Sequence, residues 1–258
     1  MSRILRNIVG GGRKWLRPRV QVTVTEPCHL LEFSHWIESA SLRMDVPIDL
    51  LRMQGGFAFD SDHPFVKALN EGAETLFDFY EGFQPRSIAE FYALECVGRV
   101  GEDLPPWEIP WYLRESRIPP PGEKKLGREH GVSFYGPATE EKIALEMSRL
   151  RSVCESIKSN GFTPDNHGDI EGYVMRDGAD LCFFVRGGKH RAAALASLGY
   201  RTVPVAFRRG FPRVIDTSQT DFWPLVRNGS IDGSLAKDVF SAYTRPKPQL
   251  RDRHGQTT

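Results

Sequence analysis

The part of the sequence that most constrains the fold is a strand, a glycine pair and a helix in direct succession. Apolar residues at 183–185 predict a buried strand, and the alanine-rich residues at 189–198 predict a helix. The spacing of apolar residues changes from strand period to helix period across Gly187-Gly188. We therefore expect the glycine pair at the C-terminal edge of a strand, where it opens the helix.

The residues of this turn have the chemistry of a phosphate-binding site. A helix N-terminus presents unpaired N–H groups and the positive end of the helix dipole, and glycines let the backbone approach a bulky anion. Lys189, His190 and Arg191 fall in the first helical turn, where cations oppose the dipole unless an anion is bound. Arginine also offers phosphate a bidentate fork. The alternative is an ordinary strand-to-helix corner with surface cations, since glycine pairs and cationic triplets are both common.

The elements on either side of the turn predict a small α/β unit. Apolar residues at helical spacing predict a helix over 139–160, and Gly161 ends it. Asp177-Gly178 is a hairpin signal between two strands, and the three strands of this unit are predicted at 170–176, 181–185 and 202–207. The predicted fold class is α/β (α+β): a small mixed sheet with packed helices, preceded by a mostly helical N-terminal region.

The order and spacing of these pieces resemble the ParB/sulfiredoxin superfamily. In that family a segment like Gly-x-His-Arg follows a strand and starts a helix that ends in Leu-Gly, and a Val-Pro-Val strand comes next. The matching pieces here are Gly188-x-His190-Arg191, Leu198-Gly199 and Val203-Pro204-Val205. The resemblance covers about residues 134–207, and it is fairly specific because several pieces occur in the family's order.

The resemblance implies that this turn holds nucleotide phosphates. Partition proteins of the family bind and hydrolyse CTP, sulfiredoxins use ATP to repair over-oxidised cysteine, and free-serine kinases transfer a phosphoryl group to a small alcohol. Carried over by position, the phosphate contacts are Gly187, Gly188, His190 and Arg191. Lys189 then points at the same charge or at the acceptor. The implied ligand is a nucleoside diphosphate or triphosphate, with Mg²⁺ bridging its phosphates.

Two departures from the family narrow the function. Lys189 stands where sulfiredoxins have their catalytic cysteine, which argues against sulfinic acid reduction. Residues 208–243 are short, are interrupted by glycines and prolines, and lack the helix-turn-helix that follows the nucleotide domain of partition proteins. The net charge of +1 also gives no dominant basic stripe, so we expect no sequence-specific DNA binding.

A kinase of this fold needs a carboxylate base near the transferred phosphate, and no carboxylate here lies in a family motif. Glu140, Glu141 and Asp177 are the candidates, and Glu141 and Lys189 are the two residues assigned to catalysis. Each carboxylate also has an ordinary role, because the glutamates suit a helix N-terminus and the aspartate suits a turn. Two functions stay open: an ATP- or CTP-dependent kinase or nucleotide hydrolase acting on a small-molecule acceptor, and a non-catalytic nucleotide-sensing or protein-interaction module.

The rest of the chain predicts a series of segments around this domain. An apolar face predicts a helix over 62–80, the capping box Ser87-x-x-Glu90 opens another, and residues 57–59 read as a short strand. After Pro212 we expect two short helices, which start at Asp221 and Ser234. The predicted boundaries are a basic flexible arm at 1–19, a mostly helical region at 20–100, a Pro-rich connector at 101–127, the ParB/sulfiredoxin-like domain at 128–212, short helices at 213–243 and a disordered tail at 244–258.

Composition and spacing argue against several other kinds of site. The four cysteines form no C-x-x-C pair, and His167 lies in a polar loop whose spacing matches no metal site, so no metal centre is predicted. No apolar run is long enough to span a bilayer, and the predicted location is a reducing cytoplasm. The basic arm is either solvated or in weak contact with a membrane surface. Trp107 and Trp111 either stack on a sugar or base or clamp the connector to the body.

Overall fold

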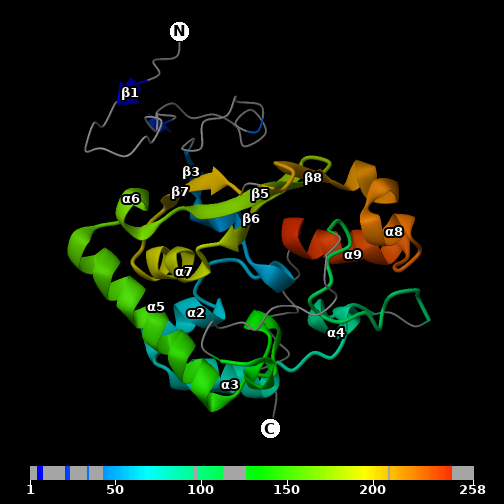
Figure 1. The fold of residues 1–258 in the computed structure, drawn as a ribbon, viewed down its shortest axis with the longest axis horizontal. Coiled ribbons are helices and arrows are strands. Elements are labelled where there is room, and N and C mark those ends of the chain that lie inside the picture. The colour runs from blue at the N-terminus through cyan, green and yellow to red at the C-terminus, as the bar shows by residue number, and fades with distance from the viewer. Residues whose placement is uncertain are drawn as a thin grey trace.

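The computed structural model of the chain describes residues 5–7, 21–23, 34, 43–95, 98–112, 126–208 and 210–245. Helices cover a mixed sheet of six strands, so the predicted α/β fold class is confirmed (Figure 1). A separate pair is formed by β1 (Leu5–Asn7) and β2 (Gln21–Thr23). Most of the predicted basic arm, residues 113–125 of the predicted connector and the predicted tail beyond residue 245 lie outside the described residues.

The six-stranded sheet is built around a hairpin of two long strands. β5 (Ile170–Asp177) and β6 (Asp180–Gly187) run antiparallel on either side of Gly178, which confirms the predicted hairpin. β7 (Thr202–Phe207), also predicted, lies parallel to β5. The carboxyl end of β6 therefore leads directly into the glycine pair.

Strands from outside residues 128–212 complete this sheet. β3 (Met44–Pro47) runs antiparallel to β7, β4 (Leu51–Arg52) runs parallel to β6, and β8 (Val214–Asp216) pairs with β5. The strand order is β3-β7-β5-β6-β4, with β8 beside β5. The strand predicted at 57–59 is wrong, because in that stretch Ala58 makes a single bridge to Arg52 and no ladder forms.

Alternation along the central strands sends side chains into two apolar cores, one on each face of the sheet. Val174 and Phe183 belong to the first core, whereas their neighbours Tyr173 and Phe184 belong to the second. Helices accordingly lie on both faces (Figure 1). The first core takes residues of α2 (Pro64–Glu71), α3 (Glu74–Gly82), α5 (Glu140–Asn160) and α7 (Lys189–Ser197), and the second takes residues of α4 (Ile88–Phe91), α8 (Pro224–Arg227) and α9 (Gly233–Thr244).

Two of the long predicted helices have different outcomes. α5 begins after Thr139, whose side-chain oxygen accepts a hydrogen bond from the Lys142 N–H, and it ends at Gly161 as predicted. The single helix predicted over 62–80 is two helices, α2 and α3, because Gly72 lies between them at φ +125°. L-residues rarely take that conformation, so the chain bends there instead of continuing one helix.

The shorter predicted helices form with altered bounds. The Glu90 N–H donates to Ser87 Oγ at 3.2 Å, which confirms the cap, although α4 has only four residues. α8 starts at Pro224 instead of Asp221, and α9 starts at Gly233, capped by Asp232. Short 3₁₀ turns occupy Ile48–Leu50, Gln54–Gly56, Arg128–His130, Ser133–Tyr135 and Thr217–Phe222. Within the described part of the chain, no helix is long and apolar enough to cross a bilayer.

Candidate anion-binding site

The turn between β6 and α7 forms as the sequence predicts. β6 ends at Gly187, and Gly188 takes the left-handed conformation (φ +86°, ψ 23°) as the residue before the first turn of α7. A Cβ on Gly188 would lie 2.9 Å from a guanidinium nitrogen of Arg191, which is closer than real contacts allow. Two features therefore favour glycine at residue 188: its left-handed backbone conformation and the Arg191 side chain beside it, which a Cβ would displace.

Helix α7 gives this turn a rigid support. Its residues Ala192, Ala193, Ala194 and Leu195 are fully buried, and α7 packs against α5, α2 and the sheet. Small side chains allow a helix to approach its neighbours closely. The N-terminus of α7 is therefore held at one place relative to the strand that precedes it.

A cavity of about 310 Å³ opens at this N-terminus. The lining contains three cationic residues, Arg149, Lys189 and Arg191, together with His190, the backbone of Gly188 and an apolar wall of Phe65, Phe134 and Val153. Arg186 also adjoins the lining, but its guanidinium lies over the rings of Tyr112 and Phe211. One carboxylate, that of Glu146, also lies in the lining. The excess of positive charge makes this cavity attractive to an anion.

Arg191 is oriented by the backbone on the opposite side of the turn. Its NH2 group donates a 2.7 Å hydrogen bond to the carbonyl oxygen of Asp169. Its Nε is buried and has no hydrogen-bond partner among the described residues. Burial lowers the pKa of Arg191, and the negative charges of Asp169 and Glu171 act against this. An unpaired buried donor is costly, so Arg191 carries a hydrogen-bonding capacity that a ligand can satisfy.

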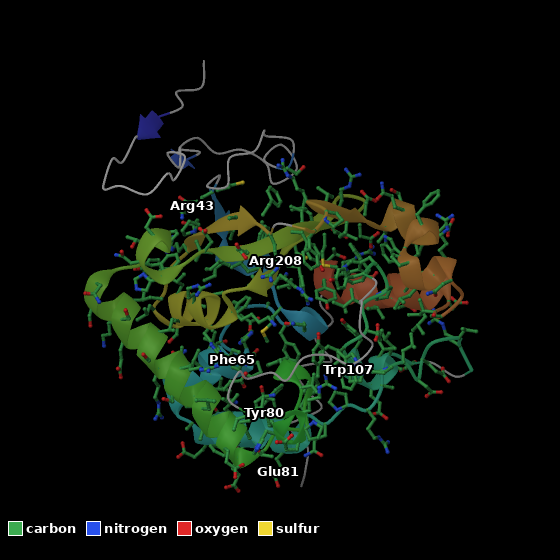
Figure 2. The ribbon with its side chains drawn as sticks, in the orientation of Figure 1. Arg43, Phe65, Tyr80, Glu81, Trp107 and Arg208 are labelled. Carbon is green, nitrogen blue, oxygen red and sulfur yellow. The ribbon has the colours of Figure 1, made fainter. Side chains whose placement is uncertain are left out.

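The loop that holds Arg191 is itself fixed by a second arginine. Arg43 donates from Nε to the Asp169 carboxylate at 2.6 Å and from NH2 to the Asp165 carboxylate at 3.0 Å. Asp165 lies in α6 (Pro164–His167), which joins α5 to β5. Figure 2 shows Arg43 at the β3 end of the sheet. Arg43 thereby links the region before β3 to the loop behind the cavity.

His190 lies against the apolar wall, with its ring centroid 5.2 Å from that of Phe65. Burial, together with the positive charges of Lys189, Arg149 and Arg191, lowers the pKa of His190 to about 4. The imidazole is therefore neutral at pH 7. A neutral imidazole carries one N–H donor and one acceptor, so His190 can donate one hydrogen bond to an anion.

The carboxylates predicted for catalysis lie elsewhere. Glu141 is exposed in the first turn of α5, where a hydrogen bond from its own backbone N–H holds its pKa below the usual range. Glu140 is exposed beside it, and Asp177 pairs with Arg245 at the β5–β6 turn. None of the three lines the cavity, whereas Lys189 and the predicted phosphate contacts Gly188, His190 and Arg191 do. Gly187 adjoins that lining at the end of β6.

Sequence reasoning missed Glu146, the carboxylate in the cavity. A signal for it exists, because Lys142 and Glu146 are charged residues within the apolar stripe of Ile143, Met147 and Leu150 on α5. Both charged side chains are buried. Buried charges are rarely there by chance, since each needs a partner or a function.

Two other predicted features are structural. The Trp111 ring packs on Trp223 and Phe240, and its Nε1–H donates to Tyr173 Oη at 3.0 Å, which agrees with the clamp. His167 lies within 3.3 Å of Ser156 Oγ. The described residues contain no group of three or more His, Cys, Asp or Glu side chains suited to hold a metal ion.

No family model, no curated protein and no solved structure matches this chain.

Proposed function

We propose that this chain binds a nucleoside diphosphate or triphosphate with Mg²⁺ at the turn formed by residues 187–191. The observation that carries the proposal is the cavity lining, in which Arg149, Lys189 and Arg191 meet a helix N-terminus and a single carboxylate. Cations held this close repel one another, so a compact anion of high charge is the ligand that stabilises them best. The resemblance of residues 134–207 to the ParB/sulfiredoxin superfamily makes nucleotide phosphates the expected anion.

Each residue of the turn has a role that follows from its surroundings. Gly188 places no side chain at the N-terminus of α7 and makes no side-chain cap there, and a helix N-terminus favours an oxyanion. Arg191, held by the Asp169 carbonyl, offers its Nε–H. His190 donates one hydrogen bond as a neutral imidazole, and Lys189 supplies a point charge.

Mg²⁺ enters this cavity with the phosphates. It keeps several waters and binds through substrate phosphates plus one or two protein carboxylates. The lining holds a single carboxylate, that of Glu146, which is too few for a metal site built from protein ligands. The residues present therefore fit a metal ion that arrives on the nucleotide better than a resident metal held by protein ligands alone.

The size of the cavity indicates which part of the nucleotide it takes. A volume of about 310 Å³ lies at the lower end of the range for small-molecule pockets. The phosphates fill such a space, and the ribose and base extend beyond it. We therefore expect affinity to depend more on the number of phosphates than on the identity of the base.

The same cavity serves either of two functions. A small-molecule kinase or nucleotide hydrolase needs a base and an acceptor beside the phosphates, whereas a nucleotide-sensing module needs neither. The buried carboxylate of Glu146 is the observation that favours the enzyme.

Calorimetric titration of the full chain with Mg²⁺ tests the proposal. The ligands are ATP, CTP, GTP and UTP, the corresponding diphosphates and monophosphates, and inorganic triphosphate. We expect triphosphates to bind at least ten-fold more tightly than monophosphates, with smaller differences between bases. A chain that binds none of these compounds, or that binds all of them equally, contradicts the proposal.

A further inference from the structure

The presence of Glu146 in a cationic cavity needs an explanation. Its side chain is 7% exposed and shares the lining with Arg149, Lys189 and Arg191. A carboxylate repels phosphate, so for anion binding alone an amide or an apolar residue would serve better at this position. Glu146 therefore has a role other than attracting the anion.

A tyrosine from another helix fixes the position of this carboxylate. Tyr80 on α3 is fully buried, and its hydroxyl donates a 2.7 Å hydrogen bond to Glu146 Oε2. Figure 2 shows Tyr80 below the sheet, on the side where α2, α3 and α5 lie. The hydrogen bond from Tyr80 therefore fixes the orientation of the Glu146 carboxylate.

The surroundings of Glu146 combine burial with positive charge. Burial raises the pKa of Glu146, while the Tyr80 hydrogen bond and the charges of Lys142 and Lys189 lower it. Lys142, one turn earlier on α5, is fully buried, and burial lowers its pKa. A carboxylate with a raised pKa is a stronger base than a solvated one.

We propose that Glu146 is the general base for phosphoryl transfer from the bound nucleotide to a hydroxyl acceptor, either a small alcohol or water. The inference rests on the proposed nucleotide binding. The acceptor O–H proton passes to the Glu146 carboxylate, and the acceptor oxygen forms a bond to the terminal phosphorus. The bond from that phosphorus to the bridging oxygen breaks, and the nucleoside diphosphate leaves with the electron pair. Tyr80 is a positioning residue that holds the carboxylate.

The decisive variant is Glu146→Gln, which keeps the shape and the oxygen that Tyr80 contacts but removes the basicity. We expect it to bind ATP or CTP with Mg²⁺ at least as tightly as the parent, because a negative charge has left the cavity. Its turnover should fall about 10²- to 10⁴-fold. Glu155→Gln, an exposed glutamate of the same helix, is the matched control and should leave nucleotide binding and turnover unchanged.

Turnover is followed as nucleoside diphosphate release with water alone and with glycerol, L-serine or glucose as acceptor. A parent that binds nucleotide but transfers to none of them overturns this inference and leaves the proposed binding function standing. Equal turnover in Glu146→Gln and the parent also overturns it. Loss of Mg²⁺-dependent binding in Glu146→Gln would make the residue a metal ligand instead of a base.

Tyr80→Phe provides an independent test through the pH profile. The groups near Glu146 are Tyr80 from α3, Lys142 and Arg149 from α5, and Lys189 and His190 from α7, with His63 of the α2 cap beside the last two. The Tyr80 hydrogen bond lowers the pKa of Glu146, so its removal raises that pKa. The acidic limb of the turnover profile should move to higher pH. If turnover in Tyr80→Phe is slower but the acidic limb of its pH profile does not move, Tyr80 acts on folding alone, which contradicts its positioning role.

Discussion

At the scale of single residues, the Arg191 guanidinium has one donor in a hydrogen bond and another, Nε, that can still bind a ligand. The hydrogen bond to the Asp169 carbonyl fixes the guanidinium, and the buried Nε has no partner among the described residues. The side chain is only half-buried, so it is not part of the apolar core. Its removal should therefore affect ligand binding more than folding.

We expect Arg191→Ala to lower nucleotide affinity about 30- to 1000-fold, which corresponds to the loss of about 2–4 kcal/mol from a bidentate charged contact. The free energy of unfolding should fall by only about 1 kcal/mol, because one hydrogen bond to a backbone carbonyl is lost. Calorimetry and urea unfolding measure the two quantities. Arg151→Ala, an exposed arginine of α5 outside this cavity, is the control and should change neither. Unchanged nucleotide affinity in Arg191→Ala would place the phosphates elsewhere.

Gly188 and Gly199 offer a matched pair of positions at the two ends of α7. Both have positive φ, +86° and +79°, but a Cβ at 188 meets Arg191 at 2.9 Å, whereas a Cβ at 199 meets nothing within 4 Å. Both Gly→Ala changes should destabilise the fold by about 1–2 kcal/mol through backbone strain. Only Gly188→Ala should weaken nucleotide binding, because only there is Arg191 displaced. Equal nucleotide affinity in Gly188→Ala and Gly199→Ala would show that Arg191 does not contribute to nucleotide binding.

At the scale of elements, a buried histidine at the start of α2 makes the stability of the folded protein depend on pH. His63 is 1% exposed and caps α2, since its Nδ1 accepts a hydrogen bond from the Phe65 N–H. The ring stacks on Phe59 at a centroid distance of 4.5 Å. Burial lowers the pKa of His63 to about 3, and the positive charges of His190 and Lys189 contribute to this.

The folded protein should lose stability as the pH falls below the pKa of an unfolded histidine, about 6.5. The folded state keeps His63 neutral down to a pKa of about 3, so between these values the unfolded state binds the extra proton and is favoured. Acidification from pH 7 to 5 should cost about 2 kcal/mol from this residue. His63→Asn keeps an N-capping acceptor but does not titrate, so its urea unfolding should show a shallower pH dependence. An identical pH dependence in the parent and variant would contradict this assignment.

At the scale of the whole molecule, one sheet joins three parts of the sequence. Residues 44–52 supply two of its strands, residues 170–207 supply the centre, and residues 214–216 add another. Leu51 of β4 and Val46 of β3 are fully buried in the first core. The turn that holds the anion therefore depends on segments far from it in sequence.

We expect a fragment of residues 128–212 not to fold by itself. It lacks β3, β4 and β8, together with α2, α3 and α9, so both cores would be open to solvent. Loss of that burial removes the main stabilising contribution to a small domain. Circular dichroism and amide NMR dispersion measure this, with a chain of residues 43–245 as the control. Cooperative unfolding of the short fragment would show that it is an independent domain.

The sequence by itself determined the strand-to-helix turn and the helix that follows it. Glycines at a left-handed position, an alanine-rich helix and the Asp177-Gly178 hairpin are local features, and their conformations depend on neighbouring residues. α5 was predictable for the same reason, because its cap at Thr139, its apolar stripe and its end at Gly161 lie within one segment. These elements contain most of the cations that line the cavity.

Only the tertiary structure decided which carboxylate meets those cations. Glu141 and Glu146 lie on the same helix, and the packing of α5 against α3 and α7 buries one and exposes the other. Tyr80, the hydrogen-bond partner of Glu146, is 66 positions away in the sequence. β3, β4 and β8 were missed for a related reason, since strands of two to four residues carry little periodicity and form by pairing with distant strands. Burial and strand pairing are interactions between segments remote in sequence, and no local pattern records them.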